Sequence, residues 1–195
     1  NYKKLSSELK KAGHEFYTNS DTETIVHAYE EWGDAFLAKL KGMFAFAIWD
    51  EEKKRLIIAR DRIGIKPLYY AKQGKKLFFA SEIKALLKGI GEKPALDEDA
   101  LNEFFSLGYV YGNKTLFKQV KKLEQGSCMT VDGNAGGAVS VEKYWELGTE
   151  INDAGEGFYL KSLEERLKQS VRDHLISDMP VGAFVSGGLD SSLLV

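Results

Sequence analysis

The first forty residues carry apolar side chains at helical spacing. Leu5 and Leu9 lie four positions apart, so they share one face of a helix expected over residues 2–11. The same spacing recurs over residues 20–33, and a shorter helix is expected over residues 34–40. The start of the chain is therefore predicted to be helical.

The second of these helices has an N-terminal signature. Ser20 is followed three residues later by Glu23, which is the spacing of a capping box. Asp21 lies between them, and because Ser20 serves as the cap, the Asp21 carboxylate is left freer to bind a ligand. An acidic residue in a first helical turn also suits the helix dipole, so a purely structural role stays open.

The middle of the chain changes from a helical period to strands. Residues 42–50 form a nearly unbroken apolar run, which predicts a strand buried on both faces. Three further strand-like segments follow at residues 55–61, 67–73 and 76–82. A helix is then expected over residues 82–87.

The second half shows weaker patterns. A helix is expected over residues 97–106, a hairpin over 127–145, and a polar, glycine-bearing linker over 148–157. Apolar spacing predicts a helix over 160–171, and a short apolar strand is expected over 181–185 after a proline. This order of elements suggests two different architectures in series.

Composition places the chain among globular proteins. Apolar residues make up 44% and charged residues 29% of the 195 residues, which excludes wholesale disorder and supports a real core. The formal net charge of -2 gives no sign of nucleic-acid binding, and no apolar run is long enough to cross a membrane. The single cysteine gives no reason to expect an oxidising compartment, so a cytoplasmic location is expected. Since the chain shows neither an initiator Met nor a signal-like segment, we expect further sequence at both ends.

The last eleven residues, VSGGLDSSLLV, suggest a phosphate site. An apolar strand, a glycine turn and a helix start would present backbone N–H groups to an anion. Ser186, Ser191 and Ser192 add hydroxyl donors, whereas the two commoner nucleotide motifs, GxxxxGK[ST] and GxGxxG, are absent. The alternative is a serine-rich turn without a ligand.

SGGLDSS resembles the pyrophosphate loop of the ATP pyrophosphatase family, which cleaves ATP between its alpha and beta phosphates. The resemblance implies ATP and Mg²⁺ as cofactors, with the metal sharing the charge of the leaving pyrophosphate. Its metal ligands are not identified. Phe184 and Val185 match positions that contact adenine and ribose in that family, although by composition alone they are core residues. The residues implied to hold pyrophosphate are Ser186, Gly187, Gly188, Asp190, Ser191 and Ser192.

Motifs upstream indicate which member of that family the chain resembles. RDRIGIKPLYY, ASEIKALL and SDTE resemble the glutamine amidotransferase half of the glutamine-hydrolysing asparagine synthetase family, and KYWEL resembles its interdomain region. The resemblance implies an α+β fold: an N-terminal nucleophile hydrolase-type αββα sandwich, followed by the start of an α/β ATP pyrophosphatase domain. The first domain is expected over residues 1–147, with an interdomain region from about residue 94, and the second over 158–195.

The family reaction converts aspartate, glutamine and ATP into asparagine, glutamate, AMP and pyrophosphate, and ammonia passes between two sites. The resemblance implies these substrates as partners, allows a homodimer, and gives Asp21 the role of holding the ammonium group of glutamine. Neither nucleic acid nor a membrane is expected as a partner. Two alternatives stay open: a ligase without glutaminase activity that closes a lactam or peptide ring, and a non-catalytic module with the hydrolase fold.

The nucleophile of the family is a cysteine at the first position of the mature chain, which uses its own α-amino group as a base. We expect that cysteine and the oxyanion donors to lie upstream, so no catalytic residue is expected here. Cys128 is far in sequence from any histidine and is expected to be a small apolar residue. His14, His27 and His174 are spread out and lack the spacing of a metal site.

Four further polar residues favour structural roles. Arg60, Asp61 and Arg62 precede a glycine turn and are expected to form structural ion pairs, because no nucleophile is present for them to assist. Ser81 is expected to cap a helix rather than to act as a catalytic serine.

Overall fold

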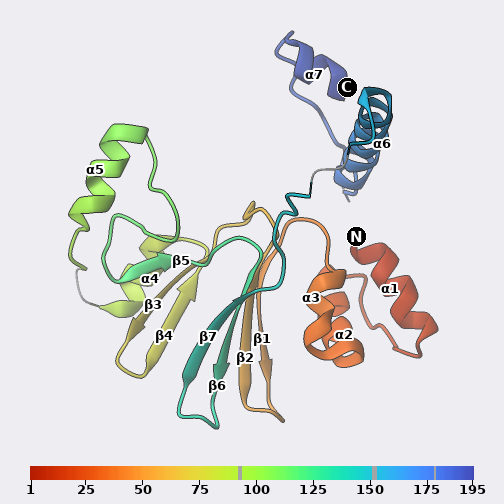
Figure 1. Cartoon of the computed structure of the whole chain (residues 1–195). Helices are drawn as coiled ribbons and strands as arrows, with labels where there is room; N and C mark the ends of the chain where they lie inside the picture. Colours follow the sequence, from red (N-terminus) through yellow and green to blue (C-terminus); the bar gives the residue numbers. More distant parts are fainter. Residues whose placement is uncertain (92–93, 151–152, 178) are drawn as a thin grey trace. The chain divides into compact units, whose positions relative to one another are not determined.

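The computed structural model describes residues 1–91, 94–150, 153–177 and 179–195. The chain forms two compact units, Asn1–Leu147 and Gly148–Val195 (Figure 1). The linker expected over residues 148–157 contains residues 151 and 152, which lie outside the described residues. Among the helices that are described, none is both long enough and apolar enough to cross a membrane.

The first unit contains helices and two sheets. Its helices are α1 Tyr2–Lys11, α2 Asp21–Trp32, the 3-10 helix η1 Gly33–Ala35, α3 Phe36–Lys39, α4 Ile83–Ile90 and α5 Glu98–Leu107. Its strands are β1 Ala45–Asp50, β2 Arg55–Arg60, β3 Tyr69–Gln73, β4 Lys76–Ala80, β5 Val120–Lys122, β6 Ser127–Asp132 and β7 Ala138–Lys143. The four-stranded sheet has the order β1-β2-β6-β7 and the three-stranded sheet the order β4-β3-β5. All neighbouring strands are antiparallel.

Strand β2 shows how the layers form. Its side chains alternate between two faces, so Ile57 and Ala59 pack with α1, α2 and α3, while Ile58 points to the opposite side. There Ile58 and Met129 of the four-stranded sheet share a core with partly buried residues of β3 and β4. Figure 1 shows α1–α3 beside the four-stranded sheet.

The outer face of the three-stranded sheet is covered in the same way. Ala71 of β3 and Val120 of β5 pack against Leu86 of α4, and all three side chains are buried. Helices, sheet, sheet and helix therefore follow one another in four layers. This confirms the α+β class and the αββα sandwich.

The prediction that residues 42–50 form a strand buried on both faces is wrong. β1 begins only at Ala45 and lies at the edge of the four-stranded sheet, where Trp49 is 52% exposed. An edge strand has one neighbour, so its side chains are incompletely covered by adjacent residues. The strand with buried side chains on both faces is β2.

The predicted structural residues before the glycine turn bond to backbone, not to each other. The Arg60 guanidinium donates to the carbonyl oxygens of Lys66, Gly64 and Leu123, each at 2.7 Å. Arg62 donates to the Ala38 carbonyl oxygen at 3.0 Å. The expected structural role fits these contacts, but among the described residues no ion pair joins the arginines to Asp61.

The second unit contains α6 Glu156–His174 and α7 Leu189–Leu194. Helix α6 is longer than the predicted span of residues 160–171. The predicted strand over residues 181–185 is not formed, because in the described part of this unit no strand supplies backbone partners for it. Val181 and Val185 are both more than half exposed.

Candidate functional site

Asp21 is the first residue of α2, at a well-defined helix start. The Ser20 hydroxyl caps the helix by accepting a hydrogen bond from the Thr22 N–H at 3.1 Å, as predicted. Asp21 Oδ1 accepts from the same N–H at 2.9 Å. Asp21 Oδ2 has no hydrogen-bond partner among the described residues, so this oxygen is available to a ligand.

The second half of the predicted capping box is absent. Instead of bonding the Ser20 N–H, the Glu23 carboxylate accepts from the N–H groups of Tyr17 and Thr18, both at 2.8 Å, and from the Thr18 hydroxyl. These hydrogen bonds lower the pKa of Glu23, and the one from the Thr18 hydroxyl contributes most. Glu23 therefore holds the loop before α2.

Asp21 lies on a cavity of about 320 Å³ between the start of α2 and the exposed edge strand β1. This volume is at the lower end of the range typical of small-molecule sites, about 300–1,000 Å³. Asp21, Lys66 and the hydroxyls of Thr22 and Ser81 supply polar groups. The remaining lining residues are Ile25, Val26, Met43, Phe44, Ala45, Phe46, Ala47, Ile48 and Pro67. The cavity therefore offers both charge signs beside an apolar wall.

Ser81 reaches this cavity because it does not cap a helix. Helix α4 begins at Ile83, and the capping position is Glu82, whose side chain makes no capping hydrogen bond. The prediction for Ser81 is therefore wrong. The actual boundary lies two residues beyond Ser81, and sequence spacing alone does not fix helix ends to that precision.

Asp61 supports the wall that carries Lys66. Its side chain is fully buried, and its two carboxylate oxygens accept from the Ile65 and Lys66 N–H groups, both at 2.9 Å. A carboxylate that accepts two backbone hydrogen bonds fixes the local turn. Asp61 thus positions the cavity without lining it.

The glycine loop lies in the second unit. Gly187 has φ of +80°, a left-handed conformation that favours glycine, and Gly188 precedes α7. The Ser186 and Ser191 hydroxyl oxygens are 3.0 Å apart, and Ser191 Oγ also donates to the Gly188 carbonyl oxygen at 3.2 Å. The structure therefore brings the ends of SGGLDSS together in a compact turn with Asp190 in the first turn of α7.

The residues just before the loop are not core residues in this structure. Phe184 is fully exposed and Val185 is 55% exposed. Ser192 donates its N–H to the Gly188 carbonyl oxygen at 3.1 Å and so belongs to the helix start. Asp21 lies in the first unit and these loop residues in the second, so the chain carries two separate candidate sites.

Cys128 behaves as the predicted small apolar residue. It lies in β6, packs partly against the helical core, and is not among the residues that line the Asp21 cavity. Burial is the main reason that the pKa of its thiol is raised to about 11. The thiol is therefore protonated near neutral pH, whereas a cysteine nucleophile reacts as the thiolate.

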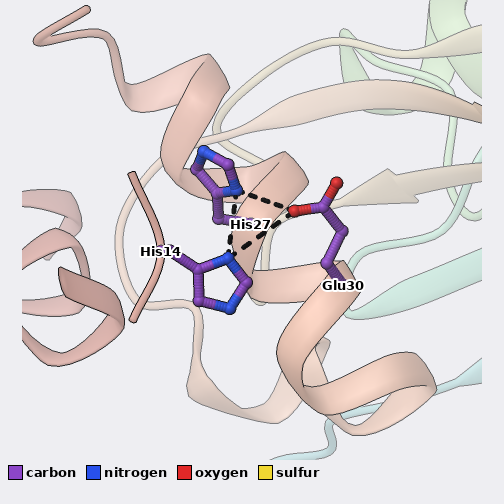
Figure 2. A group of neighbouring side chains, drawn as sticks. All are labelled: His14, His27 and Glu30. Atoms are coloured by element: carbon purple, nitrogen blue, oxygen red, sulfur yellow. Dashed lines mark hydrogen bonds and ion pairs between the residues drawn. The ribbon is translucent and has the colours of Figure 1, made fainter. Parts of the chain in front are cut away.

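Two of the three histidines meet in the folded chain, although their sequence spacing is not that of a metal site. His14 Nδ1 lies 3.2 Å from His27 Nδ1, and Glu30 Oε2 lies 2.7 Å from the latter atom (Figure 2). His27 and Glu30 are one helical turn apart, which is visible in the sequence. The approach of His14 is not, since it depends on how the loop after α1 returns to α2.

Comparison with known proteins finds two families along the chain. The glutamine amidotransferase domain family matches residues 1–145, and the asparagine synthase family matches residues 162–195. Glutamine-hydrolysing asparagine synthetase 3 of Bacillus subtilis is 36% identical over the whole chain, which covers 31% of that protein. Synthetase 1 of the same organism is 37% identical, again over the whole chain and 30% of the relative. The chain thus spans about a third of the length of these curated relatives.

Other relatives extend the comparison. Amidase chry2 of Gibberella zeae is 35% identical over 91% of this chain and 26% of its own length. A solved structure described as the allosteric regulatory enzyme of purine biosynthesis has a TM-score of 0.50 at 25% identity, covering 78% of this chain and 27% of that one. The chain therefore belongs to the glutamine amidotransferase family, and here that domain is followed by a segment that matches the asparagine synthase family.

Proposed function

We propose that this chain forms part of an enzyme that makes asparagine from aspartate, using ATP and the amide nitrogen of glutamine. Two relatives named as glutamine-hydrolysing asparagine synthetases match the whole chain, and the glutamine amidotransferase and asparagine synthase matches follow one another along it. The first unit would release ammonia from glutamine. The second would contribute to the activation of aspartate by ATP.

The Asp21 cavity carries the proposal. A carboxylate with a free oxygen is suited to an ammonium group, because a charge-assisted hydrogen bond is stronger than a neutral one. Lys66, on the same cavity, offers a positive charge for a substrate carboxylate. An α-amino acid such as glutamine has both groups.

The glycine loop would hold the pyrophosphate of ATP. Ser186, Ser191 and Ser192 offer hydroxyls, and Asp190 offers the oxygen ligand that Mg²⁺ prefers. The donor set therefore fits a magnesium pyrophosphate group. When bound, Mg²⁺ would neutralise part of the charge on the leaving group. Phe184 and Val185 are exposed and can contact adenine and ribose.

We infer that the nucleophile for glutamine hydrolysis is not Cys128. Its raised thiol pKa opposes activation, and it does not line the Asp21 cavity. The nucleophile would belong to the longer protein of which this chain forms a part.

The test uses the full-length protein that contains this sequence, with ATP, aspartate and glutamine labelled with ¹⁵N at the amide. We expect labelled asparagine and one pyrophosphate per asparagine. If ATP is cleaved to pyrophosphate but glutamine is not hydrolysed, the ring-closing ligase alternative replaces the proposal. If neither asparagine nor pyrophosphate forms, the proposal is wrong.

A further inference from the structure

The loop after α1 and one face of α2 bring two imidazoles and a carboxylate together, and none of these three residues lines the Asp21 cavity. His14 Nδ1, His27 Nδ1 and Glu30 Oε2 are separated by 3.2 Å, 2.7 Å and 3.7 Å (Figure 2). All three are groups that can bind a metal ion, and each offers one ligand atom within 4.8 Å of the other two. We propose that His14, His27 and Glu30 bind a divalent transition-metal ion of the zinc class.

The spacing of the three atoms suits such an ion. Tetrahedral zinc has bonds of about 2.0–2.1 Å to nitrogen, which places its ligand atoms about 3.3 Å apart. The three measured separations lie on both sides of this value. The shortest one is the His27–Glu30 hydrogen bond, which a bound ion would replace.

The opposite nitrogen of each ring faces a carboxylate. His14 Nε2 is 3.0 Å from Glu31 Oε2, and His27 Nε2 is 3.8 Å from Glu23 Oε1. A histidine ligand typically donates its second ring N–H to a carboxylate, which fixes the tautomer and leaves the other nitrogen lone pair for the metal. His14 Nε2 is within hydrogen-bond distance of Glu31, so this pairing leaves His14 Nδ1 for the metal, whereas at His27 the ion would replace the hydrogen bond between Nδ1 and Glu30.

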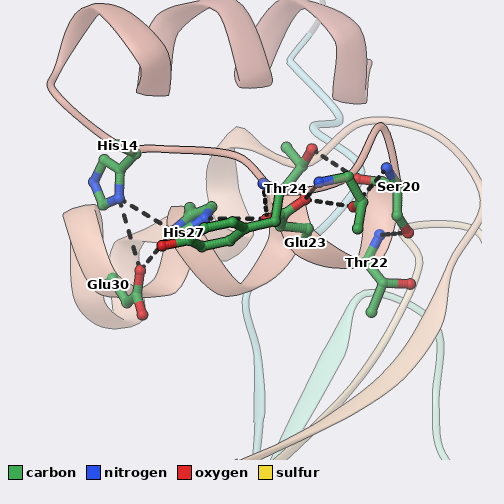
Figure 3. A network of polar contacts seen from close by, with 9 residues as sticks. His14, Ser20, Thr22, Glu23, Thr24, His27 and Glu30 are labelled. Carbon is green, nitrogen blue, oxygen red and sulfur yellow. Dashed lines mark hydrogen bonds and ion pairs between the residues drawn. The ribbon is translucent and has the colours of Figure 1, made fainter.

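These outer carboxylates are themselves positioned. Glu23 is held by the Tyr17 and Thr18 N–H groups (Figure 3), so His27 packs against a fixed acid. The Phe16 ring lies 4.6 Å from the His27 ring, centroid to centroid, and limits its rotation. The His27 imidazole is therefore oriented before any ion binds.

Charge and access also favour a dication. The carboxylates of Glu23, Glu30 and Glu31 surround two imidazoles, which are neutral when they act as ligands. The two histidine side chains are only 17% and 15% exposed, whereas Glu30 is 53% exposed. The ion can enter from the Glu30 side and keep a water molecule as its fourth ligand. Imidazole with carboxylate favours zinc-like ions over Mg²⁺ or Ca²⁺, which prefer oxygen ligands alone.

Binding would link the loop between α1 and α2 to the third turn of α2 through side chains. His14 belongs to the loop between α1 and α2, while His27 and Glu30 belong to α2. The first turn of α2 carries Asp21 and Thr22 of the cavity. An ion at this cluster would therefore fix the loop to the helix that presents Asp21.

The test uses the tag-free chain, stripped of metal with a chelator and titrated with Zn²⁺ by calorimetry and with Co²⁺ by visible absorption. We expect one site with a dissociation constant below about 10 μM and a tetrahedral Co²⁺ spectrum. His14→Gln and His27→Gln should abolish it. Glu31→Gln, which keeps all three ligands, should weaken it about 10- to 100-fold.

His174→Gln is the matched control, because His174 lies on α6 and bonds the Ser170 carbonyl oxygen, outside the cluster. It should leave both titrations unchanged. Circular dichroism checks that each variant is folded. If a variant of a ligand residue does not fold, the metal affinity of Glu31→Gln tests the site instead. The proposal would be overturned if no stoichiometric metal site is found. It would also be overturned if His174→Gln and Glu31→Gln weaken metal binding equally, and the cluster would then be held by hydrogen bonds alone.

Discussion

Two aspartates of the first unit differ in burial and hydrogen bonding, and each environment fits a different role. Asp61 is fully buried and both of its carboxylate oxygens accept backbone hydrogen bonds. Asp21 is exposed on a cavity, with one oxygen unbonded among the described residues. The first arrangement stabilises a turn, and the second leaves a carboxylate for a ligand.

Replacing Asp61 by Asn should destabilise the first unit. The amide NH₂ would face one of the two N–H groups that the carboxylate now accepts, leaving a buried donor unpaired at a cost of about 1–3 kcal/mol. The free energy of unfolding can be measured in urea by tryptophan fluorescence. Trp32, Trp49 and Trp145, the three tryptophans of the chain, all lie in the first unit.

Glu52→Gln is the control for Asp61→Asn, since it also removes one negative charge but from the exposed turn between β1 and β2. We expect its effect to stay within about 0.5 kcal/mol. Equal destabilisation by the two substitutions would show that the Asp61 hydrogen bonds contribute nothing specific.

At the scale of single elements, the sequence predicts what local patterns determine. Helices α1 and α2 follow from apolar spacing, and the β6–β7 hairpin follows from two strand-like runs around a turn. The exposure of β1 was not predictable, because burial depends on which strand lies beside it. The three-residue β5 was missed since so short a segment has no resolvable period.

Gly126, just before β6, tests the packing of this hairpin. It is buried with φ of +63°, and a Cβ there would lie 2.5 Å from the Trp145 carbonyl oxygen. Gly126→Ala should therefore lower the free energy of unfolding through both backbone strain and a steric clash, by about 2 kcal/mol or more.

Gly74→Ala separates these two causes. Gly74 has a similar φ of +59°, but a Cβ there meets no atom within 4 Å. Gly74→Ala should lower the free energy of unfolding by the backbone strain alone, about 1–2 kcal/mol. If urea unfolding shows that both variants lose the same free energy of unfolding, the steric clash with Trp145 does not contribute to the effect of Gly126→Ala.

At the scale of the whole molecule, the chain has two units, which carry matches to two families. The family and fold were predictable because SGGLDSS and the upstream motifs are specific and contiguous. The His14–His27 pair was not, since thirteen positions separate the two residues and only the folded loop brings them together. The additional wall of the cavity, from β1, was likewise set by tertiary structure.

Two substitutions in the full-length protein separate the roles of the two units. Asp21→Asn removes the charge proposed to hold glutamine, so kcat/KM for glutamine should fall about 10- to 100-fold. Ammonia-dependent asparagine synthesis should be retained. Asp190→Asn should abolish synthesis with either nitrogen source and leave glutamine hydrolysis intact.

The decisive measurement is therefore the ratio of glutamine-dependent to ammonia-dependent asparagine synthesis in these variants. The proposed roles predict a ratio that falls about 10- to 100-fold in Asp21→Asn, with normal glutamine hydrolysis in Asp190→Asn. An unchanged ratio in Asp21→Asn, or undiminished synthesis in Asp190→Asn, would contradict the assignment of the corresponding site.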